Sequence, residues 1–104
     1  MKNLSSNYGL FFQALSNKTR LDILDLLRNE SFTVTKLSEK LNLEQSRVSH
    51  ALKCLVNCAF VKSKSLGKER IYSINGNIWG LFRIVDAHVK KYCKNLESCR
   101  VIKK

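Results

Sequence analysis

Apolar residues recur along this chain at two spacings: every three to four residues over most of its length, and every second residue over a short stretch beyond its middle. The first spacing is typical of a helix with one buried face, and the second of a strand with one buried face. Helical spacing predicts helices over residues 4–15, 18–28, 34–41 and 44–58, and a last helix that begins near Ile78. Alternation predicts two strands, residues 60–64 and 70–74, joined by the Gly-containing loop 65–68. We therefore expect a mainly α fold of about five helices with a two-stranded hairpin.

Polar residues precede two of these helices and are suited to cap them. Ser16-Asn17 stands before the second helix and Thr33 before the third. Between those helices, Phe32 and Val34 can add a brief edge strand or fill a gap in the core as a plug. In the second helix we expect a buried apolar set, namely Leu21, Ile23, Leu24, Leu26 and Leu27. Trp79, close to the end of the hairpin, is expected in the core.

The helix over 44–58 carries the most informative pattern. Its apolar stripe consists of Val48, Ala51, Leu52, Leu55 and Val56. At about 100° per residue, the other side presents Ser46, Ser49, His50, Lys53 and Asn57, with Gln45 and Arg47 beside them near the start. That face holds hydrogen-bonding and basic groups but no acid, which suits a DNA major groove. An ordinary solvated helix face is the alternative interpretation.

The neighbouring elements favour the DNA interpretation. Asn42-Leu43 forms a tight turn between the helix over 34–41 and the helix over 44–58, which describes a helix-turn-helix. The hairpin that follows carries four cations, Lys62, Lys64, Lys68 and Arg70, and one acid, Glu69. A basic hairpin after a helix-turn-helix is a wing, and we expect its cations to contact backbone phosphates.

The net charge also favours a polyanionic partner. The chain has 19 Lys and Arg against 8 Asp and Glu, a formal charge of +11. Residues 44–104 hold thirteen basic and four acidic side chains, a net of +9. No apolar run approaches the roughly 20 residues of a membrane span, and no secretion signal is apparent. We expect a single domain over residues 1–104, a cytoplasmic location and no membrane partner.

Three segments resemble the ArsR/SmtB-type winged-helix repressors: ALSNKTRLDILDLL, LEQSRVSHALKCL and KERIYSI. The match runs in register from about residue 10 to residue 75. The resemblance implies a homodimeric prokaryotic transcriptional repressor that releases DNA when a metal or other inducer binds. Many members carry two cysteines where this chain has Thr33 and Thr35, and hydroxyls are poor ligands for soft cations.

A coiled-coil-like seam in the last helix predicts the dimer contact. Its members are Phe82, Val85, Val89, Tyr92, Leu96 and Cys99. Together with Phe11 and Leu15 of the first helix, they exceed what a winged core needs. We therefore expect the terminal helices to pack against a second copy.

The resemblance also points to a metal site on the last helix. Members that sense zinc-like metals use Asp-x-His and, ten residues on, His-x-x-Glu. Here Asp86 and His88 are present, Cys99 replaces the second His, and Ile102 replaces the Glu. Carboxylate, imidazole and thiolate all bind zinc, so zinc or a similar divalent metal is a candidate cofactor. The alternatives are an exposed Asp86–His88 pair with Cys99 in the seam, or a thiol switch of Cys93 and Cys99.

The resemblance places the other two cysteines, Cys54 and Cys58, at positions that Val and Ala usually fill, and we expect both to be buried and reduced. The alternative is that this pair, four residues apart, forms half of a zinc site.

Together these patterns predict a sequence-specific DNA-binding repressor. The expected DNA contacts are Gln45, Ser46, Arg47, Ser49, His50, Lys53, Lys62, Lys64, Lys68 and Arg70. The alternatives are an architectural nucleic-acid binder and a winged-helix protein-interaction module. No nucleophile–base motif, glycine-rich phosphate loop or paired catalytic carboxylates appear, so we do not expect an enzyme.

Overall fold

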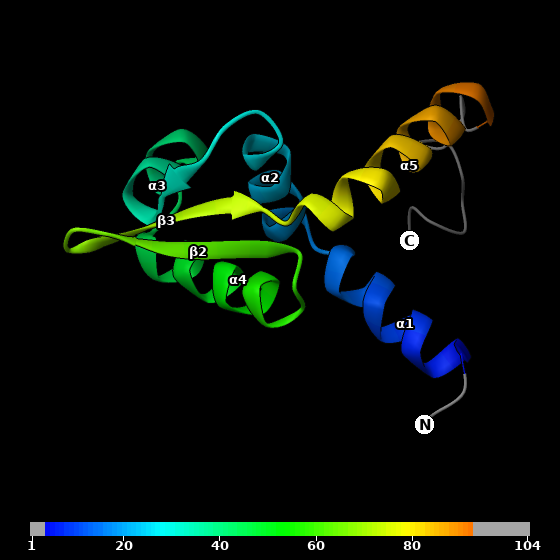
Figure 1. The fold of residues 1–104 in the computed structure, drawn as a ribbon, viewed down its shortest axis with the longest axis horizontal. Helices are drawn as coiled ribbons and strands as arrows, with labels where there is room; N and C mark the ends of the chain where they lie inside the picture. The colour runs from blue at the N-terminus through cyan, green and yellow to red at the C-terminus, as the bar shows by residue number, and fades with distance from the viewer. Residues whose placement is uncertain (1–3, 93–104) are drawn as a thin grey trace.

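Residues 4–92, the part of the chain described by the computed structural model, form five α-helices and a three-stranded antiparallel sheet (Figure 1). The helices are α1 (Leu4–Leu15), α2 (Lys18–Leu27), α3 (Val34–Leu41), α4 (Gln45–Asn57) and α5 (Trp79–Tyr92), and a 3₁₀ turn, η1 (Gly76–Ile78), precedes α5. The strands are β1 (Phe32–Thr33), β2 (Val61–Leu66) and β3 (Glu69–Ile74). The predicted winged helix-turn-helix class is confirmed.

Both predicted caps are confirmed. The side chain of Asn17 accepts a hydrogen bond from the backbone N–H of Arg20 at 3.0 Å. The hydroxyl of Thr33 accepts one from the backbone N–H of Lys36 at 3.2 Å. Because the first N–H groups of a helix lack partners within the helix, these contacts fix where α2 and α3 begin.

The sheet has one strand more than the predicted hairpin, and this strand, β1, confirms the brief edge strand expected at Phe32. Its strand order is β1-β3-β2, and β1 pairs with β3 through Phe32 opposite Tyr72 and Thr33 opposite Ile71. The predicted loop over residues 65–68 is too long, because pairing continues to Leu66 opposite Glu69. Gly67, at φ 62°, supplies the left-handed conformation that a two-residue hairpin turn requires, so the strands extend to meet it.

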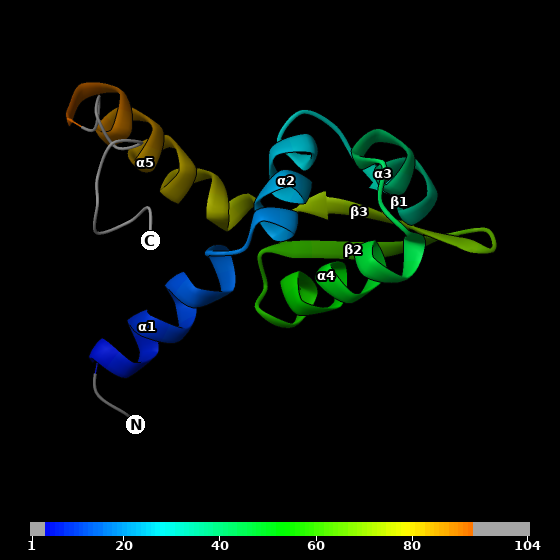
Figure 2. The same ribbon diagram turned by 180° about the vertical axis from the view of Figure 1, so that it is seen from behind.

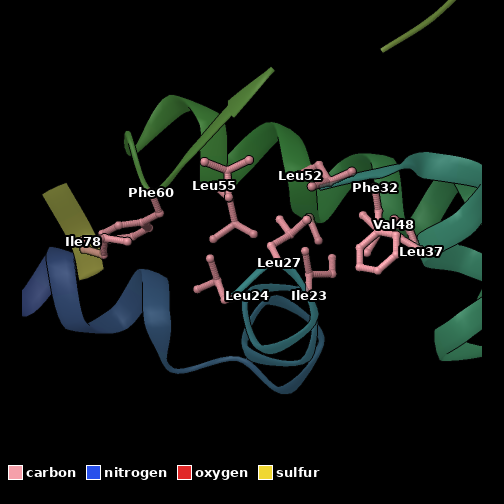
Figure 3. Packing of buried hydrophobic residues seen from close by; sticks show 12 residues of the cluster. Ile23, Leu24, Leu27, Phe32, Leu37, Val48, Leu52, Leu55, Phe60 and Ile78 are labelled. Carbon is pink, nitrogen blue, oxygen red and sulfur yellow. The ribbon is translucent and has the colours of Figure 1, made fainter. Parts of the chain in front are cut away.

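The core lies mainly between α2 and α4. Figure 3 shows the side chains of these two helices pointing toward each other. The buried apolar residues are Ile23, Leu24, Leu27, Phe32, Leu37, Val48, Ala51, Leu52, Leu55, Phe60, Val61 and Ile78. Since all but one precede the end of the wing, the core is nearly complete before α5 begins.

Helices α1 and α5 extend from the end of the molecule opposite the tip of the wing (Figures 1 and 2). None of the side chains of α5 is buried, and Val85 and Val89 are 43% and 39% exposed. In α1, Phe12 is exposed, but Phe11 packs edge-on against Phe60 with ring centroids 5.2 Å apart. Phe11, predicted to face a second copy, thus helps to close the core of its own chain.

Two predicted core positions are wrong. Leu21 is 45% exposed, because it lines an open groove between α1, α2 and α5. Trp79 is 36% exposed, since Ile78 already closes the core and the next residue turns outward as α5 starts. No helix within residues 4–92 is both long and apolar enough to span a membrane.

Candidate nucleic-acid interface

Helix α4 exposes the side that its periodicity predicts. Val48, Ala51, Leu52 and Leu55 are buried against the core. The exposed residues of the helix include all six predicted DNA contacts, Gln45, Ser46, Arg47, Ser49, His50 and Lys53, and also Asn57. Because the buried stripe fixes the rotation of the helix about its axis, these polar side chains share a defined orientation.

The connection from α3 to α4 is a short capped turn. Asn42 adopts a left-handed conformation at φ 55°, and the N–H of Leu43 donates to the carbonyl of Ser38 at 3.1 Å. This pairing satisfies a C-terminal carbonyl of α3 and reverses the chain within three residues. The angle between the two helices is therefore set by backbone geometry.

The strand register divides the wing cations between two faces. Ser63 lies opposite Tyr72 and Ser65 opposite Arg70, so these four residues share the face that adjoins α4. Lys62 and Lys64 alternate with them and lie on the other face. Lys68 lies in the hairpin turn. The four predicted phosphate contacts of the wing are thus not on one surface.

Arg70 bonds within the wing. Its Nη2 and Nε donate to the hydroxyl of Ser63 at 2.9 and 3.3 Å, and its Nη1 donates to the hydroxyl of Ser65 at 3.5 Å. These bonds cross from β3 to β2 and hold the two strands together beyond the buried part of the sheet.

A hollow of about 200 Å³ lies where α4 meets the wing. It is lined by Ser49, Lys53, Val56 and Asn57 of α4 and by Ser63 and Tyr72 of the hairpin. Ser63 and Tyr72 are absent from the predicted contacts. The alternation of the strands carried this signal, because Ser63 and Tyr72 lie in register with the buried Val61 and the half-buried Ile74 and so face the same side of the sheet.

Of the three predicted metal ligands, Asp86 and His88 lie within the described residues. Asp86 accepts a hydrogen bond from the guanidinium of Arg28, and the ring of His88 lies against that of Tyr92 with centroids 4.9 Å apart. Cys93, Cys99 and Ile102 lie outside the described residues. Between residues 4 and 92, no three His, Cys, Asp or Glu side chains cluster closely enough to hold a metal ion.

The two cysteines at the end of α4 are more accessible than predicted. Cys54 is half-buried, whereas Cys58 is exposed because it is the C-cap residue, where the helix ends and the stripe leaves the core. Desolvation by the surrounding protein raises the pKa of the Cys58 thiol, and the neighbouring Cys54 raises it further. The thiol of Cys58 is therefore kept protonated at neutral pH.

Two comparisons with known proteins place the chain in a family, one over the helix-turn-helix region and one over most of the chain. Residues 17–63 match the family described as bacterial regulatory protein, arsR family. The arsenical resistance operon repressor of Staphylococcus aureus is 32% identical over 89 residues, which cover 81% of this chain and 86% of that protein. The chain belongs to the arsR family. The family resemblance inferred from the three sequence segments is confirmed.

Other arsR-family relatives extend the comparison. The regulator NmtR of Mycobacterium tuberculosis is 44% identical over 62 residues, 60% of this chain, and the chain spans only about half of NmtR (52%). The homodimeric winged helix-turn-helix DNA-binding domain Mb0332 of Mycobacterium bovis superposes with a TM-score of 0.76 at 26% identity, over 86% of this chain and 83% of that one. The likeness in fold thus extends over more of the chain than the family match.

In this arsR-family chain, Thr33 has a structural role at a position where the resemblance led us to expect a cysteine in many members. Its hydroxyl caps α3, as described above. Thr35 provides a backbone carbonyl to the hydroxyl of Ser38 at 3.0 Å. Neither side chain offers a thiolate, so the soft-metal site expected at this helix in those members is missing here.

Proposed function

We propose that the protein is a sequence-specific DNA-binding transcriptional repressor. The observation that carries this proposal is the exposed side of α4, where polar and basic side chains face outward from a helix whose other side is fully packed. A helix held in this way presents its side chains at fixed positions, which base recognition in the major groove requires. Membership of a family of bacterial regulatory proteins supports the same function. The proposed function includes no enzymatic activity.

In the proposed complex, α4 lies in the major groove. Gln45, Ser46, Ser49 and His50 are the base-reading candidates, and Arg47 is placed to contact either bases or phosphates. Lys53 and the wing cations Lys62, Lys64, Lys68 and Arg70 are the phosphate-contact candidates. Since Lys62 and Lys64 lie on the wing face away from α4, they would meet a different stretch of backbone from Arg70.

We further propose that two copies bind DNA together. An open apolar groove of about 510 Å³ runs between α1, α2 and α5, and its walls include Phe12, Leu21, Phe82 and Val85. Exposed apolar patches of this kind mark contact sites, and the similar Mb0332 domain is homodimeric. A two-fold dimer through the terminal helices would carry two copies of α4 and match a near-palindromic operator. The complex would act in the cytoplasm, where the operator lies.

The proposed mechanism assigns no step to a metal. One relative is named for an arsenical resistance operon, but the described part of this chain brings no metal-ligand set together. Release of DNA by metal or thiol chemistry at the C-terminal helix is a hypothesis from the sequence, and it depends on residues beyond 92.

An architectural nucleic-acid binder is the second candidate, and the formal charge of +11 favours it. Fluorescence anisotropy separates the two. The full chain is titrated against a duplex from upstream of its own gene and against a random duplex, at 50 to 300 mM salt. A repressor binds the first at least about 1,000-fold more tightly. A ratio near one supports the architectural binder, and weak binding to both duplexes overturns both candidates.

A further inference from the structure

We propose that the hollow between α4 and the wing binds one backbone phosphate of DNA, with Ser63 and Tyr72 as ligands beside Lys53. Ser49, which also lines the hollow, is thereby reassigned from base reading to this phosphate. The inference rests on the proposed DNA-binding function and adds a defined phosphate site to it. Neither Ser63 nor Tyr72 belongs to the contacts expected from sequence.

The chemistry of the walls matches a phosphodiester. Lys53 supplies a positive charge, while Ser49, Ser63 and Tyr72 supply hydroxyl donors and Asn57 an amide donor. No carboxylate lines the hollow. Donors converging from a helix and a strand pair around one small space suit an anion with several acceptor oxygens.

These donors are free to bind a ligand. Within the described part of the chain, the side chains of Ser49, Lys53 and Tyr72 form no hydrogen bond or ion pair with other residues. Tyr72 is only half-buried, so its phenol remains accessible, although β3 holds its backbone between two neighbouring strands. A donor held by two strands loses little freedom when it binds, which favours affinity.

Arg70 prepares Ser63 for this role. The Ser63 hydroxyl oxygen already accepts two bonds from the Arg70 guanidinium, at 2.9 and 3.3 Å. Its own proton is then left to donate elsewhere, and the positive charge behind the oxygen makes it a better donor. Arg70 is therefore a positioning residue for Ser63 in this site, whatever contacts its exposed part makes with DNA.

The place of the hollow along α4 fits a backbone contact. Ser49, Lys53 and Asn57 follow one another at intervals of four residues and so share one side of the helix. That line leads from the centre of α4 to its C-terminal end, away from the N-terminal half that carries Gln45 and Ser46. A helix whose first half reads bases meets the flanking strand with its second half and with the adjoining wing.

The test measures DNA affinity and its salt dependence for Tyr72→Phe, Ser63→Ala and Lys53→Ala. We expect Tyr72→Phe to weaken binding to every duplex by about tenfold, because a hydrogen bond to a charged group is lost. The slope of log K against log[salt] should stay unchanged, since a neutral donor releases no counterion. Lys53→Ala should lower the magnitude of that slope by about one.

Two matched controls isolate the hollow. Tyr8→Phe removes an exposed phenol from α1, and Ser73→Ala removes a hydroxyl from the opposite face of β3, where Ser73 pairs with Lys62. Both should bind DNA as the wild type does. If Tyr72→Phe and Ser63→Ala also bind as the wild type does, the phosphate site is overturned while the DNA-binding function stands. A wild type that binds no duplex overturns the proposed function itself.

Uncharged methylphosphonate linkages identify which DNA phosphate the hollow binds, and competition with inorganic phosphate tests whether the ligand is DNA or the free ion. In a duplex from upstream of the gene, single phosphates are replaced by methylphosphonate, and the penalty at one position should shrink in Tyr72→Phe. A penalty that is the same in wild type and variant at every position overturns the inference. Inorganic phosphate, added at constant ionic strength, should displace DNA only at millimolar concentrations. Displacement by micromolar phosphate would make the hollow a site for the free ion and overturn the DNA assignment.

Discussion

The guanidinium of Arg28 donates to the carboxylate of Asp86 across 2.5 Å, joining the C-terminal end of α2 to the middle of α5. The same guanidinium lies 5.8 Å from the ring centre of Trp79 and 5.6 Å from that of Phe82. These contacts add to the packing of the half-buried Leu81 and Phe82 against the core, so they contribute to the attachment of α5 to the rest of the chain.

We expect Arg28→Ala to lower the free energy of unfolding by about 1–2 kcal/mol, because it removes an ion pair and two cation–π contacts at a partly exposed site. Asp86→Asn should cost about 0.5 kcal/mol, since it removes only the ion pair. Urea denaturation of the full chain measures both. Lys18→Ala, which breaks the exposed Lys18–Asp22 pair, is the control and should change little. An Arg28→Ala midpoint equal to that of the wild type would contradict this assignment.

The same ion pair bears on the metal hypothesis. Because Arg28 already engages the Asp86 carboxylate, we expect Asp86→Asn to leave any zinc response of the protein unchanged. Calorimetry with zinc on the reduced chain, and DNA affinity with and without zinc, measure this response. Loss of zinc binding in Asp86→Asn, but not in the control Asp22→Asn, would restore Asp86 as a ligand.

The base-reading side of α4 gives a specificity prediction. His50→Ala should cost about 1–3 kcal/mol on the cognate duplex and reduce preference at particular base pairs. Lys64→Ala should instead weaken binding to all sequences alike, since it removes a phosphate contact. Anisotropy titrations against a set of single-base variants distinguish the two patterns. If both substitutions weaken every duplex equally, His50 does not read bases.

The proposed dimer predicts a difference between two exposed positions on α5. Val89→Glu should dissociate the dimer, because it places a charge on the apolar seam. Ile84 is more exposed still, at 69%, and lies outside both the seam and the residues that line the groove. Ile84→Glu is therefore the control and should remain dimeric. Light scattering at micromolar concentration gives the mass of each, and a monomeric wild type would exclude the dimer.

The sequence predicts the features that depend on local interactions. The start of α3 follows from the Thr33 hydroxyl, and the exposed side of α4 follows from the spacing of Val48, Leu52 and Leu55. Period and capping chemistry act over a few residues, so they can be recognised without knowing the fold.

The errors arise where two elements meet. Trp79 is exposed because the first turn of α5 turns it outward, while Ile78 before it and Leu81 and Phe82 after it face the core, which no local pattern records. The hollow beside Tyr72 exists only because β2 and β3 lie against α4. Burial and shared surfaces of this kind depend on tertiary packing, and hydrophobic spacing alone does not determine them.

The two-residue strand β1 has a mechanical consequence. Phe32 pairs with Tyr72 on the wing, and the next residue, Thr33, caps α3. A single short segment thus ties the base of the wing to the first helix of the helix-turn-helix, so the two have little freedom to move against each other. We expect the helix-turn-helix and the wing of each copy to bind DNA as one rigid body. A signal that releases DNA would then change the distance and the angle between the DNA-binding surfaces of the two copies in the proposed dimer, while the shape of each surface stays the same.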